Sequence, residues 1–117
     1  MYNSKIIGLG KYLPDNIVSN ADLEKIMDTT DAWIQERTGI RERRHIVKGS
    51  EDTTFTMGVK ASKIAIERAG ITSKEIDLIL FATLSPDYYF PGSGVLVQDA
   101  LDIPDCPAMD IRMQCSG

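Results

Sequence analysis

The stretch Pro104-Asp105-Cys106-Pro107-Ala108-Met109-Asp110-Ile111-Arg112-Met113-Gln114-Cys115-Ser116-Gly117 organises the interpretation of the whole chain. A turn rich in Pro and Asp gives way to a strand-like run over residues 108–113, which leads into Cys-Ser-Gly. This order predicts a sharp turn with a thiol at its tip. A helix starting there would point backbone N–H groups at Cys115, and such dipoles favour the thiolate, the nucleophilic form of cysteine.

Length and composition predict one globular domain with its own core. The chain has 117 residues, of which 43% are hydrophobic and 26% charged. A net charge of −4 argues against nucleic acid as a partner. The exception is the stretch 37–48, where four arginines and one lysine stand against a single glutamate. Such a stretch is suited to a phosphate or an acidic partner.

The sequence contains no apolar run near the roughly 20 residues that a membrane span needs. Residues 1–7 lack the long apolar region of a signal peptide. We therefore expect a cytoplasmic protein that does not bind membranes. Its two cysteines, nine residues apart, fit no common zinc or thioredoxin-like spacing, so we expect no metal and two free thiols.

Helical and strand-like segments alternate along the chain, which predicts an α/β layer structure with a mostly parallel sheet. The expected strands or extended segments are residues 5–10, 40–47, 76–83 and 108–113. The expected helices are residues 19–27, 31–37, 53–70 and 93–101, with a single turn at 72–75. Residues 78–82 are apolar without a break, which indicates a strand covered on both faces.

The first expected strand ends at two glycines. Gly8-Leu9-Gly10 has the spacing that opens a dinucleotide-binding fingerprint, but Leu13 occupies the position of the third glycine. The residues around Leu13 also favour a loop over a helix. The sequence therefore gives little support to a nucleotide-binding role.

Four blocks together resemble the 3-oxoacyl-(acyl-carrier-protein) synthase III family. The longest is DTTDAWIQERTGIRER over residues 28–43; the others are residues 6–14, Ala82-Thr83 and Cys115-Ser116-Gly117. They occur in the family's order and spacing and cover essentially all 117 residues. The resemblance implies a thiolase fold, an α/β architecture with a mostly parallel mixed sheet and helices on its faces. Residues 1–117 would form the N-terminal one of its two similar halves.

The resemblance also implies an activity. Cys115 would be the nucleophile that takes an acyl group from acyl-coenzyme A as a thioester. The enzyme would then decarboxylate malonyl-acyl-carrier protein and condense the product with the acyl group, which initiates fatty-acid synthesis. The coenzyme A thioester is a substrate, so no resident cofactor is expected. The family's histidine and asparagine lie in the second half, so residues 1–117 are not expected to condense substrates alone.

Four further site residues are implied by the same resemblance. Trp33 matches the aromatic side chain that stacks on the adenine of coenzyme A. Arg37 matches a cation at the same binding mouth, and Thr29 a polar neighbour. Phe90 matches an aromatic side chain that crosses the interface of a homodimer into the partner's acyl pocket.

The chain departs from the family where Arg112-Met113-Gln114 replace small residues before Cys115. The acyl preference is therefore open, and a thiolase-fold relative making polyketide or branched products is an alternative. A non-catalytic domain binding coenzyme A or a protein is another. A redox module using Cys106 and Cys115 has little support, because Cys106 suits simple burial.

Two structural expectations remain. Residues 88–90 could anchor a loop instead of crossing an interface, and apolar surface along the sheet edge is expected to be exposed.

Overall fold

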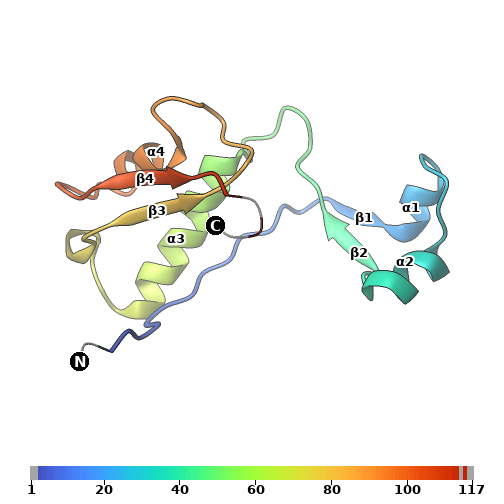
Figure 1. Ribbon diagram of the computed structural model, residues 1–117, viewed down its shortest axis with the longest axis horizontal. Coiled ribbons are helices and arrows are strands. Elements are labelled where there is room, and N and C mark those ends of the chain that lie inside the picture. The colour runs from blue at the N-terminus through green and yellow to red at the C-terminus, as the bar shows by residue number, and fades with distance from the viewer. Residues whose placement is uncertain (1–2, 114, 116–117) are drawn as a thin grey trace. The chain divides into compact units, whose positions relative to one another are not determined.

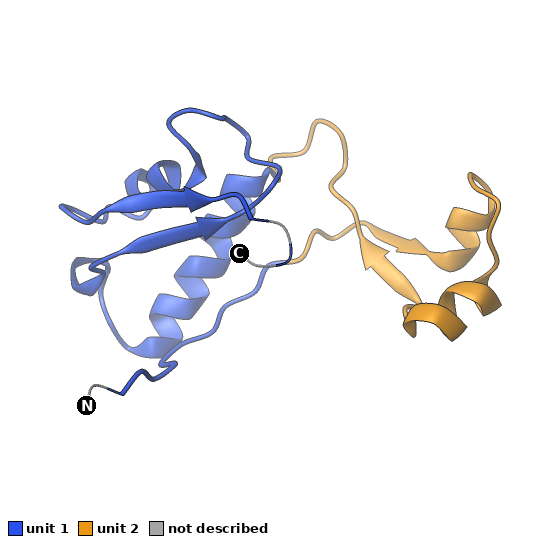
Figure 2. Cartoon of the chain, in the orientation of Figure 1, with its two compact units in different colours: residues 1–12, 53–117 blue, residues 13–52 orange. Residues whose placement is uncertain are grey.

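The computed structural model describes residues 3–113 and 115, and the chain divides into two compact units (Figure 2). Unit 1 comprises Met1–Tyr12 and Thr53–Gly117, and unit 2 comprises Leu13–Asp52. Unit 2 contains β1 (Ile17–Ser19), α1 (Asn20–Glu24), α2 (Asp31–Thr38) and β2 (Glu42–Arg44). Unit 1 contains α3 (Thr54–Ala69), the 3-10 turn η1 (Ser73–Glu75), β3 (Ile79–Ala82), α4 (Ser93–Ala100) and β4 (Ala108–Ile111) (Figure 1).

Unit 1 is built around a parallel pair of strands joined through a helix. β3 pairs with β4 from Ile79–Ala108 to Ala82–Ile111, and α4 lies in the connection between them. Parallel strands need such a crossover, so the predicted alternation of helix and strand is confirmed here. The buried apolar side chains of unit 1 are Val59, Val97, Ile103 and Cys106.

The helix boundaries follow the local sequence. Thr53 caps α3, since its side chain accepts from the backbone N–H of Thr56. Gly70 ends the helix with φ 68°, a left-handed conformation that suits glycine. The helices predicted at 31–37, 53–70 and 93–101 and the turn at 72–75 are therefore confirmed. Within the described part of the chain, no helix is long and apolar enough to span a membrane.

The prediction of a strand at residues 5–10 is wrong. This segment is extended, but no strand among the described residues pairs with it. It lies instead along α3, where a Cβ added at Gly8 or Gly10 would overlap the carbonyl oxygen of Ala65 or Ala61. The Arg68 guanidinium also donates to the Leu9 carbonyl at 3.0 Å. The two glycines therefore serve close packing of backbone on helix.

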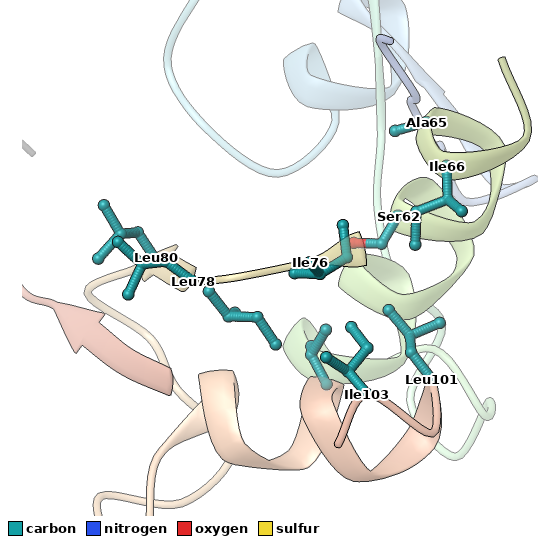
Figure 3. Close-up of a pocket in the computed structure, with 10 residues that line it drawn as sticks. Ser62, Ala65, Ile66, Ile76, Leu78, Leu80, Leu101 and Ile103 are labelled. Carbon is teal, nitrogen blue, oxygen red and sulfur yellow. The ribbon is translucent and has the colours of Figure 1, made fainter. Parts of the chain in front are cut away.

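The sheet is covered less than the sequence predicts. Ile79 and Phe81 are partly buried, whereas Leu78 and Leu80 are 48% and 54% exposed, so the expectation of two covered faces is wrong for the described residues. The expected exposure of apolar surface along the sheet is confirmed. A hollow of about 240 Å³ lies beside this exposed surface (Figure 3). It is lined by side chains of β3 and of Ile76 and Leu78 just before it, and by side chains of α3, α4 and the turn after α4.

α4 buries only some of its apolar side chains. Val97 is 3% exposed, whereas Val95 and Ala100 are exposed. The short helix turns only a narrow stripe toward α3 and the strands.

Unit 2 is organised by an antiparallel strand pair and two short helices. β1 pairs with β2 from Ile17–Arg44 to Ser19–Glu42. β2 lies inside the extended segment predicted at 40–47, but β1 was not predicted. The helix predicted at 19–27 is shorter, because α1 ends at Glu24. The buried apolar side chains of this unit are Pro14 and, in α2, Ile34.

The close contact at Gly10 can be tested by adding one methyl group. We expect Gly10→Ala to lower the free energy of unfolding of the complete protein by about 1–3 kcal/mol, because backbone atoms of α3 cannot move aside as a side chain would. Urea denaturation followed by circular dichroism measures this change. Lys11→Ala, at the exposed next position, is the control. Equal stability of the two variants would contradict the packing.

Candidate functional site

Cys115 follows the end of β4. The strand closes at Ile111, two residues before the predicted end, and Cys115 lies in a turn with an exposed side chain. Gln114, Ser116 and Gly117 lie outside the described residues, so the predicted Cys-Ser-Gly tip is described only at Cys115. An accessible thiol after a strand is what a nucleophilic role requires, and that role stays a prediction.

Cys106 has a different environment. It is 8% exposed, and the Gln98 side chain donates to its carbonyl oxygen at 2.8 Å. Neither cysteine forms a disulfide. Cys106 therefore has the packing role expected from its position beside Pro107.

Asp110 fixes the strand that leads to Cys115. Its carboxylate accepts from the backbone N–H of Ser93 at 2.9 Å and of Gly94 at 2.7 Å, the first two residues of α4. Gly92, with φ 103°, leaves room for the carboxylate. These bonds satisfy amides that have no partner inside the helix, and the helix dipole favours the negative charge there. The start of α4 and the end of β4 are therefore held together.

Phe90 lies in a loop anchored at its start. The Asp87 carboxylate accepts from the backbone N–H groups of Thr54 and Phe55 at 3.1 and 2.7 Å, at the beginning of α3. Tyr88, Tyr89 and Phe90 are nevertheless 61%, 78% and 90% exposed. A side chain as exposed as Phe90 contributes little to anchoring the loop on its own unit, which favours the alternative of an association surface.

Thr29, Trp33 and Arg37 come together at α2 in unit 2. Thr29 and Trp33 line a hollow of about 270 Å³ with Asp28 and Thr30. The Arg37 guanidinium carbon lies 6.0 Å from the centroid of the Trp33 ring, one helical turn away, at the outer limit of a cation–π contact. The indole is 56% exposed, so it offers surface on which a planar group can stack.

Asn20 holds this part of unit 2 together. It is 2% exposed; its side-chain N–H groups donate to Asp31 Oδ1 at 2.6 Å and to the Ile40 carbonyl at 2.8 Å. Its oxygen accepts from the Arg43 guanidinium at 2.8 Å. The bond from Asn20, followed by one from Gln35, holds the pKa of Asp31 below its usual value. Asn20 therefore connects the starts of α1 and α2 with β2.

Some of the cations at 37–48 have structural contacts. Arg43 binds Asn20, and the Arg44 guanidinium donates to the Pro14 carbonyl at 3.3 Å. Arg37 is the cation that the structure places beside Trp33. His45 is exposed, as expected for a surface side chain.

The predicted site residues fall into two groups. Thr29, Trp33 and Arg37 belong to unit 2, whereas Phe90 and Cys115 belong to unit 1. Among residues 3–113 and 115, no group of three His, Cys, Asp or Glu side chains could hold a metal ion. The arrangement presents a stacking surface with a cation on one unit and an exposed thiol with an exposed aromatic loop on the other.

Comparison with known proteins finds similarity over the whole chain. A beta-ketoacyl-[acyl-carrier-protein] synthase III from Coxiella burnetii (strain CbuK_Q154) is 50% identical over 118 aligned residues, and one from Aliivibrio fischeri (strain ATCC 700601 / ES114) is 53% identical over 114. These alignments cover 100% and 97% of this chain. The resemblance to the synthase III family is confirmed. No family model matches the chain.

Solved structures agree with this. The 3-oxoacyl-[acyl-carrier-protein] synthase III from Aquifex aeolicus VF5 superposes with a TM-score of 0.91 at 47% identity, over 98% of this chain and 36% of that one. The priming beta-ketosynthase of the R1128 polyketide pathway gives 0.90 at 34% identity, over 97% and 33%. The predicted thiolase-like α/β fold is confirmed. The chain spans about a third of the length of the synthase III relatives that it matches, 37% and 35% for the two above.

The residues that support the site were missed by sequence reasoning. The contacts of Asn20, Asp87, Asp110 and Arg112 were not predicted from the sequence. Asp110 carried a usable signal, because an acid inside an otherwise apolar strand must find partners if it is buried. Asp87 and Asn20 carried none, since their partners are distant in the sequence.

The role of Asn20 predicts a clear loss of stability. We expect Asn20→Ala to lower the free energy of unfolding by about 1–3 kcal/mol, because it leaves buried donors and acceptors without partners. Chemical denaturation of the complete protein measures this. Asn16→Ala, an exposed amide in the same unit, is the matched control. If both substitutions had equally small effects, Asn20 would not be the connecting residue.

Proposed function

We propose that this chain supplies the acyl-accepting cysteine and coenzyme A-binding residues of a beta-ketoacyl-[acyl-carrier-protein] synthase III. The complete enzyme condenses an acyl-coenzyme A primer with malonyl-acyl-carrier protein to initiate fatty-acid synthesis. The observation that carries the proposal is the exposed thiol of Cys115 after a parallel strand, in a chain about 50% identical to synthases of that name.

The reaction begins with transfer of the acyl group. The Cys115 thiolate attacks the thioester carbonyl of acyl-coenzyme A, a new carbon–sulfur bond forms, and coenzyme A leaves as its thiolate. Thiolates attack thioesters and leave again readily, so one slow transfer becomes two easier ones. Malonyl-acyl-carrier protein then loses carbon dioxide, and its carbon nucleophile attacks the acyl-cysteine. The Cys115 thiolate leaves, which regenerates the enzyme.

The remaining groups come from outside this chain. The histidine and asparagine that promote decarboxylation are expected in the rest of the protein. The one histidine here, His45, is exposed and lies in unit 2. The homodimer, the cytoplasmic location and the absence of a resident cofactor also stay predictions.

The coenzyme A site is proposed at Trp33. The half-exposed indole offers a stacking face, Arg37 places a cation beside it, and Thr29 adds a hydroxyl to the adjacent hollow. A nucleotide that carries phosphates needs all three: a planar partner for the base, a cation and hydrogen-bonding groups.

The alternatives gain less support. The polyketide-priming relative is 34% identical, below the 47–53% of the three synthase III relatives above. A redox module is disfavoured because Cys106 is buried whereas Cys115 is exposed.

Acyl transfer to Cys115 can be measured directly. We expect the complete protein to gain the mass of one acyl group after incubation with acetyl-coenzyme A, and Cys115→Ser to abolish this gain. Intact-protein mass spectrometry detects the change. Cys106→Ser is the matched control. It should still be acylated at Cys115, because the Cys106 thiol is buried and out of reach of the substrate. Acylation that survives in Cys115→Ser would refute the nucleophile assignment.

Stacking at Trp33 predicts weaker coenzyme binding when the indole is removed. We expect Trp33→Ala to raise the Kd for coenzyme A about 10-fold, within the roughly 1–3 kcal/mol that stacking of one base contributes. Trp33→Phe should lose less, because it keeps an aromatic face. Titration calorimetry measures Kd. Coenzyme A should also quench the fluorescence of Trp33 in the wild type, and this signal should be absent in Trp33→Phe. An unchanged Kd in Trp33→Ala would place the coenzyme elsewhere.

A further inference from the structure

Arg112 connects the strand that leads to Cys115 with the aromatic loop. Its Nη2 donates to the Tyr89 carbonyl oxygen at 2.9 Å and lies 3.7 Å from Asp110 Oδ2. The guanidinium carbon is 5.0 Å from the centroid of the Tyr89 ring. Arg112 thus combines a hydrogen bond, an ion pair and a cation–π contact, which a planar guanidinium can make together.

These contacts anchor the loop at its second end. Asp87 anchors the first end on α3, and the Thr54 hydroxyl donates to the Ser85 carbonyl at 2.7 Å. Arg112 holds the residue directly before Phe90. Phe90 is 90% exposed, so its own side chain contributes little packing that could define the loop's position.

The ion pair links Arg112 to a rigid support. Asp110 is 10% exposed in its side chain and already accepts the first two N–H groups of α4. Charge-assisted bonds of this kind are stronger than neutral ones. Arg112 therefore rests on the junction of β4 and α4, and its contacts within unit 1 disfavour a role as a free phosphate-binding cation.

We propose that Arg112 is a positioning residue that fixes Tyr89 and Phe90 against the strand leading to Cys115, and thereby selects the size of the acyl group that the enzyme accepts. The selection rests on the proposed function and on the role that the family resemblance implies for Phe90, whose side chain would enter the partner's acyl pocket. A displaced aromatic wall changes the space available for substrate carbon atoms. Pockets discriminate single methylene groups by about 10- to 200-fold, so a small displacement is measurable.

The first measurement tests the clamp without using activity. Chymotrypsin cleaves after aromatic residues but not before proline, so the exposed Tyr88 and Tyr89 are cleavage sites, whereas Pro91 blocks cleavage after Phe90. We expect Arg112→Gln to speed cleavage at these residues about fivefold in the complete protein, because the loop opens more often. Arg68→Gln is the matched control, since Arg68 also donates to a backbone carbonyl in unit 1 but contacts the Leu9 segment. Equal cleavage of Arg112→Gln and wild type would overturn the clamp.

The second measurement tests selection. The ratio of kcat/KM for acetyl-coenzyme A to that for hexanoyl-coenzyme A should shift about fivefold in Arg112→Gln and less in Arg112→Lys, which keeps the charge beside Asp110. Arg68→Gln should leave the ratio unchanged.

Equal losses on both substrates would overturn the selective role and leave Arg112 as a merely structural residue. If wild type acylated Cys115 with neither substrate, the proposed function would fail and acyl selection with it. The cleavage rates would still decide whether Arg112 clamps the loop.

Discussion

The carboxylate of Asp110 is the group on which the arrangement around Cys115 depends. It is nearly buried, and a buried carboxylate is costly unless it is hydrogen-bonded and paired. Two backbone N–H groups at the start of α4 and the Arg112 guanidinium offset that cost. Asp110 therefore joins β4 to the start of α4 directly, and to the aromatic loop through Arg112, which donates to the Tyr89 carbonyl.

The parts of the fold that the sequence predicts well are those decided within a few residues. Thr53 and Gly70 bound α3 through bonds that span three or four positions, and Thr30 and Gly39 do the same for α2. Helical geometry then places Trp33 and Arg37 on one side of α2, four residues apart. Their proximity was therefore predictable, whereas their assignment to coenzyme A came from the family resemblance alone.

The parts that the sequence could not predict depend on distant partners. Asp87 and Thr54 are 33 residues apart, and Arg112 and Tyr89 are 23 apart. Residues 5–10 have the composition of a strand, yet a strand requires a neighbouring backbone, and this segment meets the glycine-compatible surface of α3 instead. β1 was missed for the complementary reason, since three residues are too short to show a strand pattern and they pair only because β2 reaches them.

The exposed face of β3 is a further case in which the local sequence and the observed packing differ. Leu78 and Leu80 continue an apolar run whose pattern is typical of a strand covered on both faces, but the described residues cover only one. Local sequence in natural proteins usually agrees with the packing it serves, so such a disagreement indicates a layer supplied by other residues. The proposed chemistry is incomplete in the same way, because an exposed thiol can accept an acyl group but needs further groups to promote decarboxylation of malonyl-acyl-carrier protein. The synthase III relatives are nearly three times as long as this chain, which is enough to provide both the covering layer and those groups.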